Sequence, residues 1–192
     1  MRIAAAFLAA FVCFGVSAPA LASLDDDITE FDQSRLAHFA DAKRQGLSEA
    51  GSDAFVSSVV SPEGGQVAQN ELVGSWRCRI VKLGGYTPIK SYDWFRCVVR
   101  TNGNGLFFEK VTGSERLSGY LDPYQGKYVL LAAMTVGDET PKPYSGGNPG
   151  IGAPVTHTDQ VGVVSRLGAS HLKIEFPFPV YESTFDVIEL RR

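Results

Sequence analysis

The chain has 192 residues, of which 18 are basic and 21 acidic, and a formal net charge of −3 at pH 7. This length fits one domain with an appendage. The acidic excess argues against nucleic acid or an anionic membrane surface as the main partner. After residue 22, no apolar run is long enough to span a membrane as a helix.

The first 22 residues have the pattern of a cleaved secretory signal peptide. A single charged residue, Arg2, precedes an apolar run over residues 3–16, and Ala20-Leu21-Ala22 supplies the small residues of a cleavage site. A transmembrane anchor would need roughly 20 apolar residues, and Pro19 comes too early for that. We therefore expect residues 1–22 to be removed, which gives a mature chain of net charge near −4 in the periplasm or outside the cell.

Residues 23–65 are expected to form an N-terminal helical segment. Apolar residues recur with helical spacing over residues 32–50, although Lys43 interrupts their stripe and Gly46 weakens the helix. We expect the stem of Lys43 to cover apolar surface while its charge reaches water. A second short turn is expected over residues 52–60. The simplest role of the segment is a lid packed on the following sheet, and the alternative is an arm that binds a partner.

After residue 65 the apolar pattern changes to alternation, with turn signals roughly every ten residues, which is typical of β-strands. The expected strands are residues 76–83, 92–100, 106–111, 114–121, 127–135, 160–167, 171–176 and 183–192. The Gly- and Pro-rich run from 135 to 159 is expected to be a long loop. Eight such strands predict a small up-and-down, lipocalin-like β-barrel over residues 66–192, whose last strand pairs with its first. A β-sandwich is the alternative.

Two cysteines remain once the leader and its Cys13 are removed. In an exported chain an even pair predicts a disulfide, here between Cys78 and Cys97. If these residues lie directly opposite each other in a hairpin, antiparallel counting places Lys82 opposite Asp93. A redox or zinc role has no CxxC motif and no clustered histidine to support it.

The same register places Arg79 directly opposite Arg96, with Arg77 nearby. Like charges across a ladder are unfavourable. These side chains therefore either extend into water and pair with nearby acids, or bind a small anion or an acidic partner. We take Arg77, Arg79 and Arg96 as candidate ligand-binding residues. His157 is a fourth candidate, because it lies near Asp159 in the long loop, at an end of the barrel where ligands commonly bind; a solvated loop residue is the alternative.

The sequence contains no motif for a cofactor, a metal ion or a nucleophilic triad. Its three histidines do not share metal-ligand spacing, and no serine lies in G-x-S-x-G. The run GGNPGIG at 146–152 lacks the Lys-Ser/Thr of a phosphate-binding loop. Four carboxylates are expected on the outer face of the last strands, and a glycosidase pair among them stays open: Glu175, Glu182, Asp186 and Glu189.

Three stretches together resemble a known family. They are LVGSWRCR (72–79), KVTGSERLSGYL (110–121) and FPFPVYESTFDVIEL (176–190). Their combination is similar to the exported bacterial family of domain of unknown function 4893. The resemblance covers most of the mature chain and implies an exported protein with no established activity, so it supplies no catalytic residues.

We therefore expect an exported, non-enzymatic binding or interaction module without a cofactor. Its partner would be a small anion or another envelope or secreted protein, such as a hydrolase that it inhibits. Two other functions stay open: a hydrolase that uses strand carboxylates and His157, and a structural component of the envelope. An open pocket with two carboxylates would favour the hydrolase, and a filled barrel would argue against it.

Overall fold

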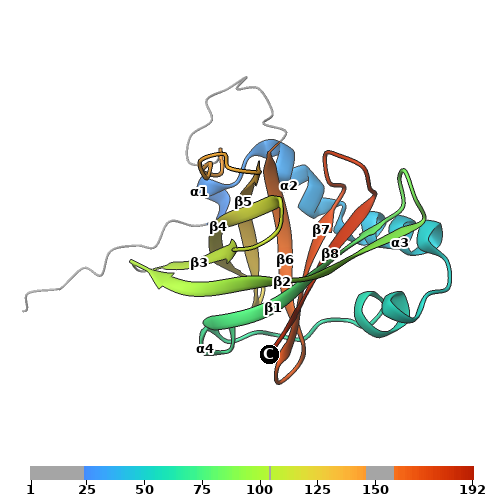
Figure 1. Ribbon diagram of the computed structural model, residues 1–192, viewed down its shortest axis with the longest axis horizontal. Helices are drawn as coiled ribbons and strands as arrows, with labels where there is room; N and C mark the ends of the chain where they lie inside the picture. Colours follow the sequence, from blue (N-terminus) through green and yellow to red (C-terminus); the bar gives the residue numbers. More distant parts are fainter. Residues whose placement is uncertain (1–23, 104, 146–157) are drawn as a thin grey trace, which may run out of the picture.

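The computed structural model describes residues 24–103, 105–145 and 158–192. Eight antiparallel strands form one closed barrel, in which each strand pairs with the next and β8 pairs with β1 (Figure 1). The strands are β1 (Gly74–Leu83), β2 (Ile89–Asn102), β3 (Gly105–Lys110), β4 (Glu115–Tyr124), β5 (Lys127–Val136), β6 (Asp159–Gly168), β7 (His171–Pro177) and β8 (Phe185–Arg191). The predicted up-and-down barrel is confirmed, and the sandwich is wrong because the closed sheet has no edge strand.

Short helices precede the barrel and lie against its side and one end (Figure 1). They are α1 (Leu24–Asp27), α2 (Glu30–Ala37), α3 (Phe39–Ala50), the π-helical turn η1 (Val56–Val60) and α4 (Gln69–Leu72). The single helix predicted over residues 32–50 is two helices, because the backbone of His38 leaves helical geometry, with φ −98° and ψ 18°. Within the described ranges, none of the helices has the length and apolar character needed to cross a membrane.

The helices α3 and η1 pack on the outer face of β1 and β8, as predicted for a lid. Val59 and Val60 of η1 join Val81 and Phe185 in an apolar cluster beneath this layer. A Cβ atom at Gly46 would lie 2.6 Å from Cβ of Phe185. The glycine that weakens α3 is therefore the residue that lets α3 approach the sheet closely.

Charged residues occupy part of this interface. Lys43, which interrupts the apolar stripe, is buried, and its ammonium lies 3.1 Å from the carboxylate of Glu175. That carboxylate also accepts a hydrogen bond from Lys173 at 2.9 Å. The expectation that the Lys43 charge reaches water is wrong, because a buried acceptor on β7 lies within its reach.

The barrel interior is apolar at one end and polar at the other. Inward side chains such as Trp76, Phe108 and Ile174 fill the apolar end. There α4 caps the barrel, since the indole N–H of Trp76 donates to the carbonyl of Leu72 at 2.8 Å. Toward the opposite end, inward positions carry charged residues, and the packing leaves a cavity.

The predicted disulfide between Cys78 and Cys97 is present, with a Cα–Cα distance of 5.8 Å. The two residues are diagonal neighbours, since Cys78 pairs with Phe95 and Cys97 pairs with Trp76. The predicted register is therefore wrong by two residues. A displacement by two keeps every side chain on its predicted face, and the right-handed twist brings diagonal neighbours close enough for the bond.

A second departure from the predicted register lies in β2. Arg79 pairs with Trp94 but Val81 pairs with Ser91, so β2 carries one extra residue at this point. The two-residue displacement alone would place Lys82 opposite Ser91 and not Asp93, and the bulge moves it one residue further, to Lys90.

We predict that replacing both cysteines by alanine lowers the free energy of unfolding by about 3 kcal/mol, because the bond closes a loop between residues 19 apart. Urea denaturation of the oxidised protein and of the Cys78→Ala/Cys97→Ala variant measures this difference. The reduced wild-type protein is the control and should match the variant. Equal stability of oxidised and reduced protein would contradict the prediction.

Candidate functional site

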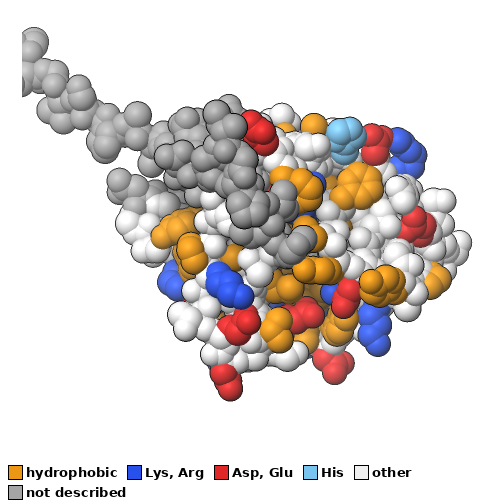
Figure 2. All heavy atoms as spheres, turned by 90° about the horizontal axis from the view of Figure 1, so that it is seen from above, with side chains coloured by type: hydrophobic (Ala, Val, Ile, Leu, Met, Phe, Trp, Pro, Cys, Tyr) orange, Lys and Arg blue, Asp and Glu red, His pale blue; other side chains and the backbone are white. Residues whose placement is uncertain are grey.

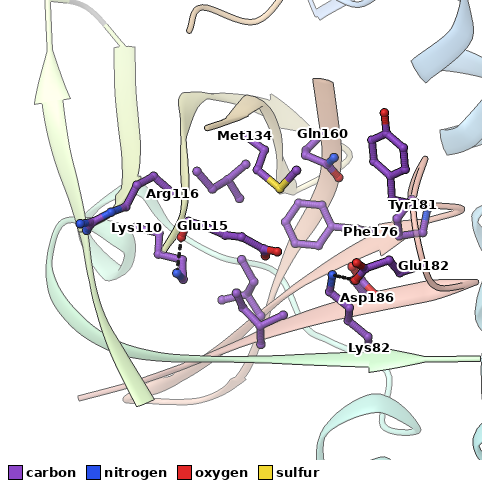
Figure 3. A pocket seen from close by; sticks show the side chains of 14 residues that line it. Lys82, Lys110, Glu115, Arg116, Met134, Gln160, Phe176, Tyr181, Glu182 and Asp186 are labelled. Atoms are coloured by element: carbon purple, nitrogen blue, oxygen red, sulfur yellow. Dashed lines mark hydrogen bonds and ion pairs between the residues drawn. The ribbon is translucent and has the colours of Figure 1, made fainter. Parts of the chain in front are cut away.

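A cavity of about 140 Å³ lies at the polar end of the barrel interior (Figure 3). Strands β1 and β3–β8 and the connection between β7 and β8 supply its walls. The apolar lining consists of Ile80, Leu117, Met134, Phe176, Pro179 and Ile188. The polar lining consists of Lys82, Lys110, Glu115, Arg116, Gln160, Tyr181, Glu182 and Asp186.

The polar residues are not equally directed into this space. Figure 3 shows Glu115 and Gln160 pointing into the cavity, whereas the side chain of Arg116 extends away from it. On the face of the molecule seen from above, hydrophobic, acidic and basic side chains are interspersed (Figure 2). The residues that line the cavity are likewise mixed in character, with apolar walls and several polar groups.

Lys82 reaches the cavity from β1 and is held by an acidic partner. Its ammonium donates to the Glu182 carboxylate at 2.7 Å. Burial lowers the pKa of Lys82, but the hydrogen bond to Glu182 and the nearby charges of Asp186 and Glu115 outweigh burial and raise it. Lys82 is therefore a charged ammonium with a partner already in place.

Lys110, at the end of β3, is buried and binds the backbone that follows it. Its ammonium donates to the backbone carbonyls of Thr112, at 2.8 Å, and of Glu115. It also lies 4.0 Å from the centre of the Phe95 ring, a favourable cation–π position. Burial lowers the pKa of Lys110 to about 8. This side chain holds the β3–β4 connection, and its donors are occupied.

Asp186 of β8 has a different environment from an ordinary surface aspartate. One of its oxygens accepts a hydrogen bond from the Ser183 hydroxyl at 2.6 Å. Burial raises the pKa of Asp186 to about 7, although the Ser183 hydrogen bond and the Lys82 charge act in the opposite direction. This carboxyl therefore exchanges its proton near neutral pH.

Two polar groups that point into the cavity have no side-chain partner among the described residues. Among the described residues, no side chain forms a hydrogen bond or ion pair with the carboxylate of Glu115 or with the amide of Gln160. Both point into the cavity (Figure 3). They are the groups through which a bound molecule would be oriented.

The sequence-predicted candidate Arg79 lies on the outer face of the barrel. Its guanidinium contacts the Glu189 carboxylate at 3.1 Å and 2.6 Å. It also stacks on the rings of Phe55 and Trp94, at 4.8 Å and 4.9 Å from their centres. Arg79 is thus occupied in joining the lid to the barrel.

Arg77 and Arg96 are the two arginines that the structure does bring together. They form a directly opposed pair between β1 and β2, and Arg77 stacks on Trp94 at 4.9 Å. Both are exposed, and neither forms an ion pair with a described residue. An anion or acidic partner at this pair stays a prediction, now without Arg79. His157 lies outside the described residues.

The expected outer position of the C-terminal carboxylates is wrong for Asp186. It shares the inward face of β8 with Ile188, and Glu182 joins it at the cavity from the β7–β8 connection. Glu175 and Glu189 do lie on the outer face, where the lid and neighbouring charges cover them. In the described part of the chain, no three His, Cys, Asp or Glu side chains are placed to hold a metal ion.

A family model described as Domain of unknown function (DUF4893) matches residues 25–190, which include every residue of the cavity wall. The chain belongs to this family. The resemblance carried by its three stretches is thereby confirmed, and the cavity lies within the part of the chain that the DUF4893 model matches. Searches of the curated proteins and of the solved structures found no match to this DUF4893 chain.

We predict that Asp186→Asn stabilises the DUF4893 domain at pH 8 by about 2–4 kcal/mol, since each pKa unit is worth about 1.4 kcal/mol. The folded-state pKa of about 7 exceeds the ordinary 3.8, so the folded wild type binds the proton more tightly than the unfolded chain. Its stability therefore falls as pH rises from about 4 through 7, and the variant lacks this fall.

Urea denaturation at pH 5 and pH 8 measures the effect. Asp93→Asn, at an exposed position of β2, is the control and should follow the wild type. A pH dependence of Asp186→Asn that matches the wild type would contradict the prediction.

Proposed function

We propose that the protein is an exported binding protein that holds a small amphipathic molecule in the mouth of its barrel. The observation that carries this proposal is the cavity, whose apolar wall surrounds the unpartnered Glu115 carboxylate and Gln160 amide. Ligand sites in proteins have this composition, with mostly apolar walls and a few convergent polar groups, and they occur in the mouths of β-barrels.

The energetic cost of the polar groups supports a role in binding. An apolar side chain in place of Asp186 would complete the core formed by Phe176 and Ile188, without the cost of desolvating a carboxylate. The pKa of Asp186 near 7 is a measure of that cost. Groups with strongly shifted pKa values gather at functional sites, where stability is given up for function.

The size of the cavity limits what it can hold. A cavity of roughly 150 Å³ accommodates a benzene-sized group, and this one has about 140 Å³. The ligand, or the part of it that enters the barrel, is therefore about as large as one six-membered ring.

The cysteines support the exported location that the leader predicts. Cys78 and Cys97 are bonded, and structural disulfides persist in oxidising compartments such as the periplasm and the cell exterior.

Hydrolysis is the second candidate, favoured by three carboxyl groups that meet at one cavity: Glu115, Glu182 and Asp186. A carboxyl with a pKa near 7 is suited to general acid catalysis, and an ionised carboxylate is suited to act as base. Binding is preferred because Glu182 pairs with Lys82 and Asp186 accepts from Ser183. These contacts leave Glu115 as the unpartnered carboxylate among the described residues of the wall.

Met134 offers a direct test, because the sequence has two methionines, Met1 in the leader and Met134 in the cavity wall. In exported protein labelled with ¹³C-methyl methionine, we predict that benzyl alcohol shifts the Met134 signal saturably. Ile80→Trp fills the cavity and should abolish the response, while Val98→Trp, on the outer face of β2, should retain it.

The absence of a saturable shift with benzyl alcohol and with its charged analogues benzylamine and benzoate would overturn the binding proposal. Turnover of p-nitrophenyl acetate or of a p-nitrophenyl glycoside that disappears in Asp186→Asn would favour the hydrolase.

A further inference from the structure

We infer that the cavity selects an organic cation, a small primary amine or amidine attached to an apolar group. This inference rests on the proposed binding function and adds the chemical class of the ligand. It follows from which charged groups of the wall are already occupied and which are not.

Both ammonium groups in the wall are occupied by the protein. Lys82 donates to Glu182 at 2.7 Å. Lys110 donates to two backbone carbonyls and lies on the ring of Phe95. An anionic ligand would compete with these contacts, and it would meet the carboxylates of Glu115 and Asp186 across the same small cavity.

The carboxyl groups outnumber the ammonium groups. Glu115, Glu182 and Asp186 face Lys82 and Lys110, and the guanidinium of Arg116 extends away from the cavity (Figure 3). With all three carboxyls ionised, the wall is short of one positive charge. A ligand ammonium placed beside Glu115 and Asp186 supplies that charge, and its N–H groups donate to oxygens that have acceptor capacity left.

The apolar lining favours an organic cation over a metal ion. Ile80, Leu117, Met134 and Ile188 surround the polar groups and would pack against the hydrocarbon part of an amine. Phe176 also lines the cavity, and an aromatic ring is a favourable neighbour for a cation.

In the protein without ligand, a proton on the Asp186 carboxyl supplies the positive charge that the ligand ammonium would supply. Asp186 faces Lys82 from β1, Glu115 from β4, and Ser183 and Glu182 from the β7–β8 connection. Burial, together with the charges of Glu115 and Glu182, keeps the pKa of Asp186 at about 7. Below that pH a bound cation must displace the proton, so amine binding weakens as pH falls.

Three probes of equal size and different charge test the inference: benzylamine, benzyl alcohol and benzoate, each followed by the Met134 methyl signal. At pH 8 we expect benzylamine to bind at least tenfold more tightly than benzyl alcohol, and benzoate to bind more weakly than either. Between pH 8 and pH 6 benzylamine stays protonated, and its affinity should fall about tenfold because Asp186 takes up a proton. The affinity for benzyl alcohol should not change.

Matched variants separate the two carboxylates. Asp186→Asn should remove the part of the pH dependence that Asp186 causes and leave the smaller part due to Lys110, whose pKa is about 8. Glu115→Gln should weaken benzylamine about tenfold while the pH dependence of the wild type remains. Glu109→Gln, an exposed carboxylate on the outer face of β3, is the control and should behave as the wild type.

The outcomes of these experiments separate the preference for an organic cation from the existence of the binding site. Binding of benzyl alcohol without preference for benzylamine would overturn the cation while leaving the binding site intact. Competition by millimolar Ca²⁺ against benzylamine would overturn the organic cation in favour of a metal ion. Failure of all three probes would overturn the binding site itself.

Discussion

The pairing of β8 with β1 closes the barrel, and both the lid and the cavity depend on this one ladder. Residues of the two strands alternate between its faces. On the inner face Lys82 lies opposite Asp186, and both line the cavity. On the outer face Val81 lies opposite Val187, within the apolar cluster that holds the helices. A shift of one residue in this register would exchange the two faces and remove both features.

The same ladder places two acids of β8 in opposite electrostatic situations. Glu189, on the outer face, is fully buried, and burial alone would raise its pKa. Hydrogen bonds and charges from Arg79 and Arg191 outweigh burial and lower it. Asp186, on the inner face, has a pKa raised to about 7 because its positive neighbour does not offset burial. The charge of Glu189 is therefore offset by its arginine neighbours on the outer face, whereas the charge of Asp186 is not offset at the cavity. That contrast is the physical reason to place function at the barrel mouth.

The fold could be predicted from the sequence because its signals are local. Alternation and turn residues define each strand, and an up-and-down order requires no long-range choice. The register could not be fixed from the cysteines, since Cys78 and Cys97 bond as diagonal neighbours and a bulge in β2 shifts the pairing of Lys82 by one more residue. Neither the diagonal disulfide nor the bulge changes the local alternation of apolar and polar residues.

The cavity could not be predicted from the sequence for a related reason. In β8 the outward Phe185 and Val187 are as apolar as the inward Ile188 and Leu190, so alternation did not tell which face held Asp186. The lid covers the outer face and removes the usual contrast between a wet and a dry side. The sequence favoured the arginines as a site because their clustering is visible in sequence, whereas the partners that occupy Arg79 are not.

The most direct test of this account is the titration of the Asp186 carboxyl in the free protein. It is followed by ¹³C NMR of aspartate-labelled protein, with Asp186→Asn to assign the signal. A pKa of about 7 is the result that the account predicts. A pKa at or below the ordinary 3.8 would mean that the wall already neutralises this carboxylate. The cavity would then have no missing positive charge for a ligand to supply.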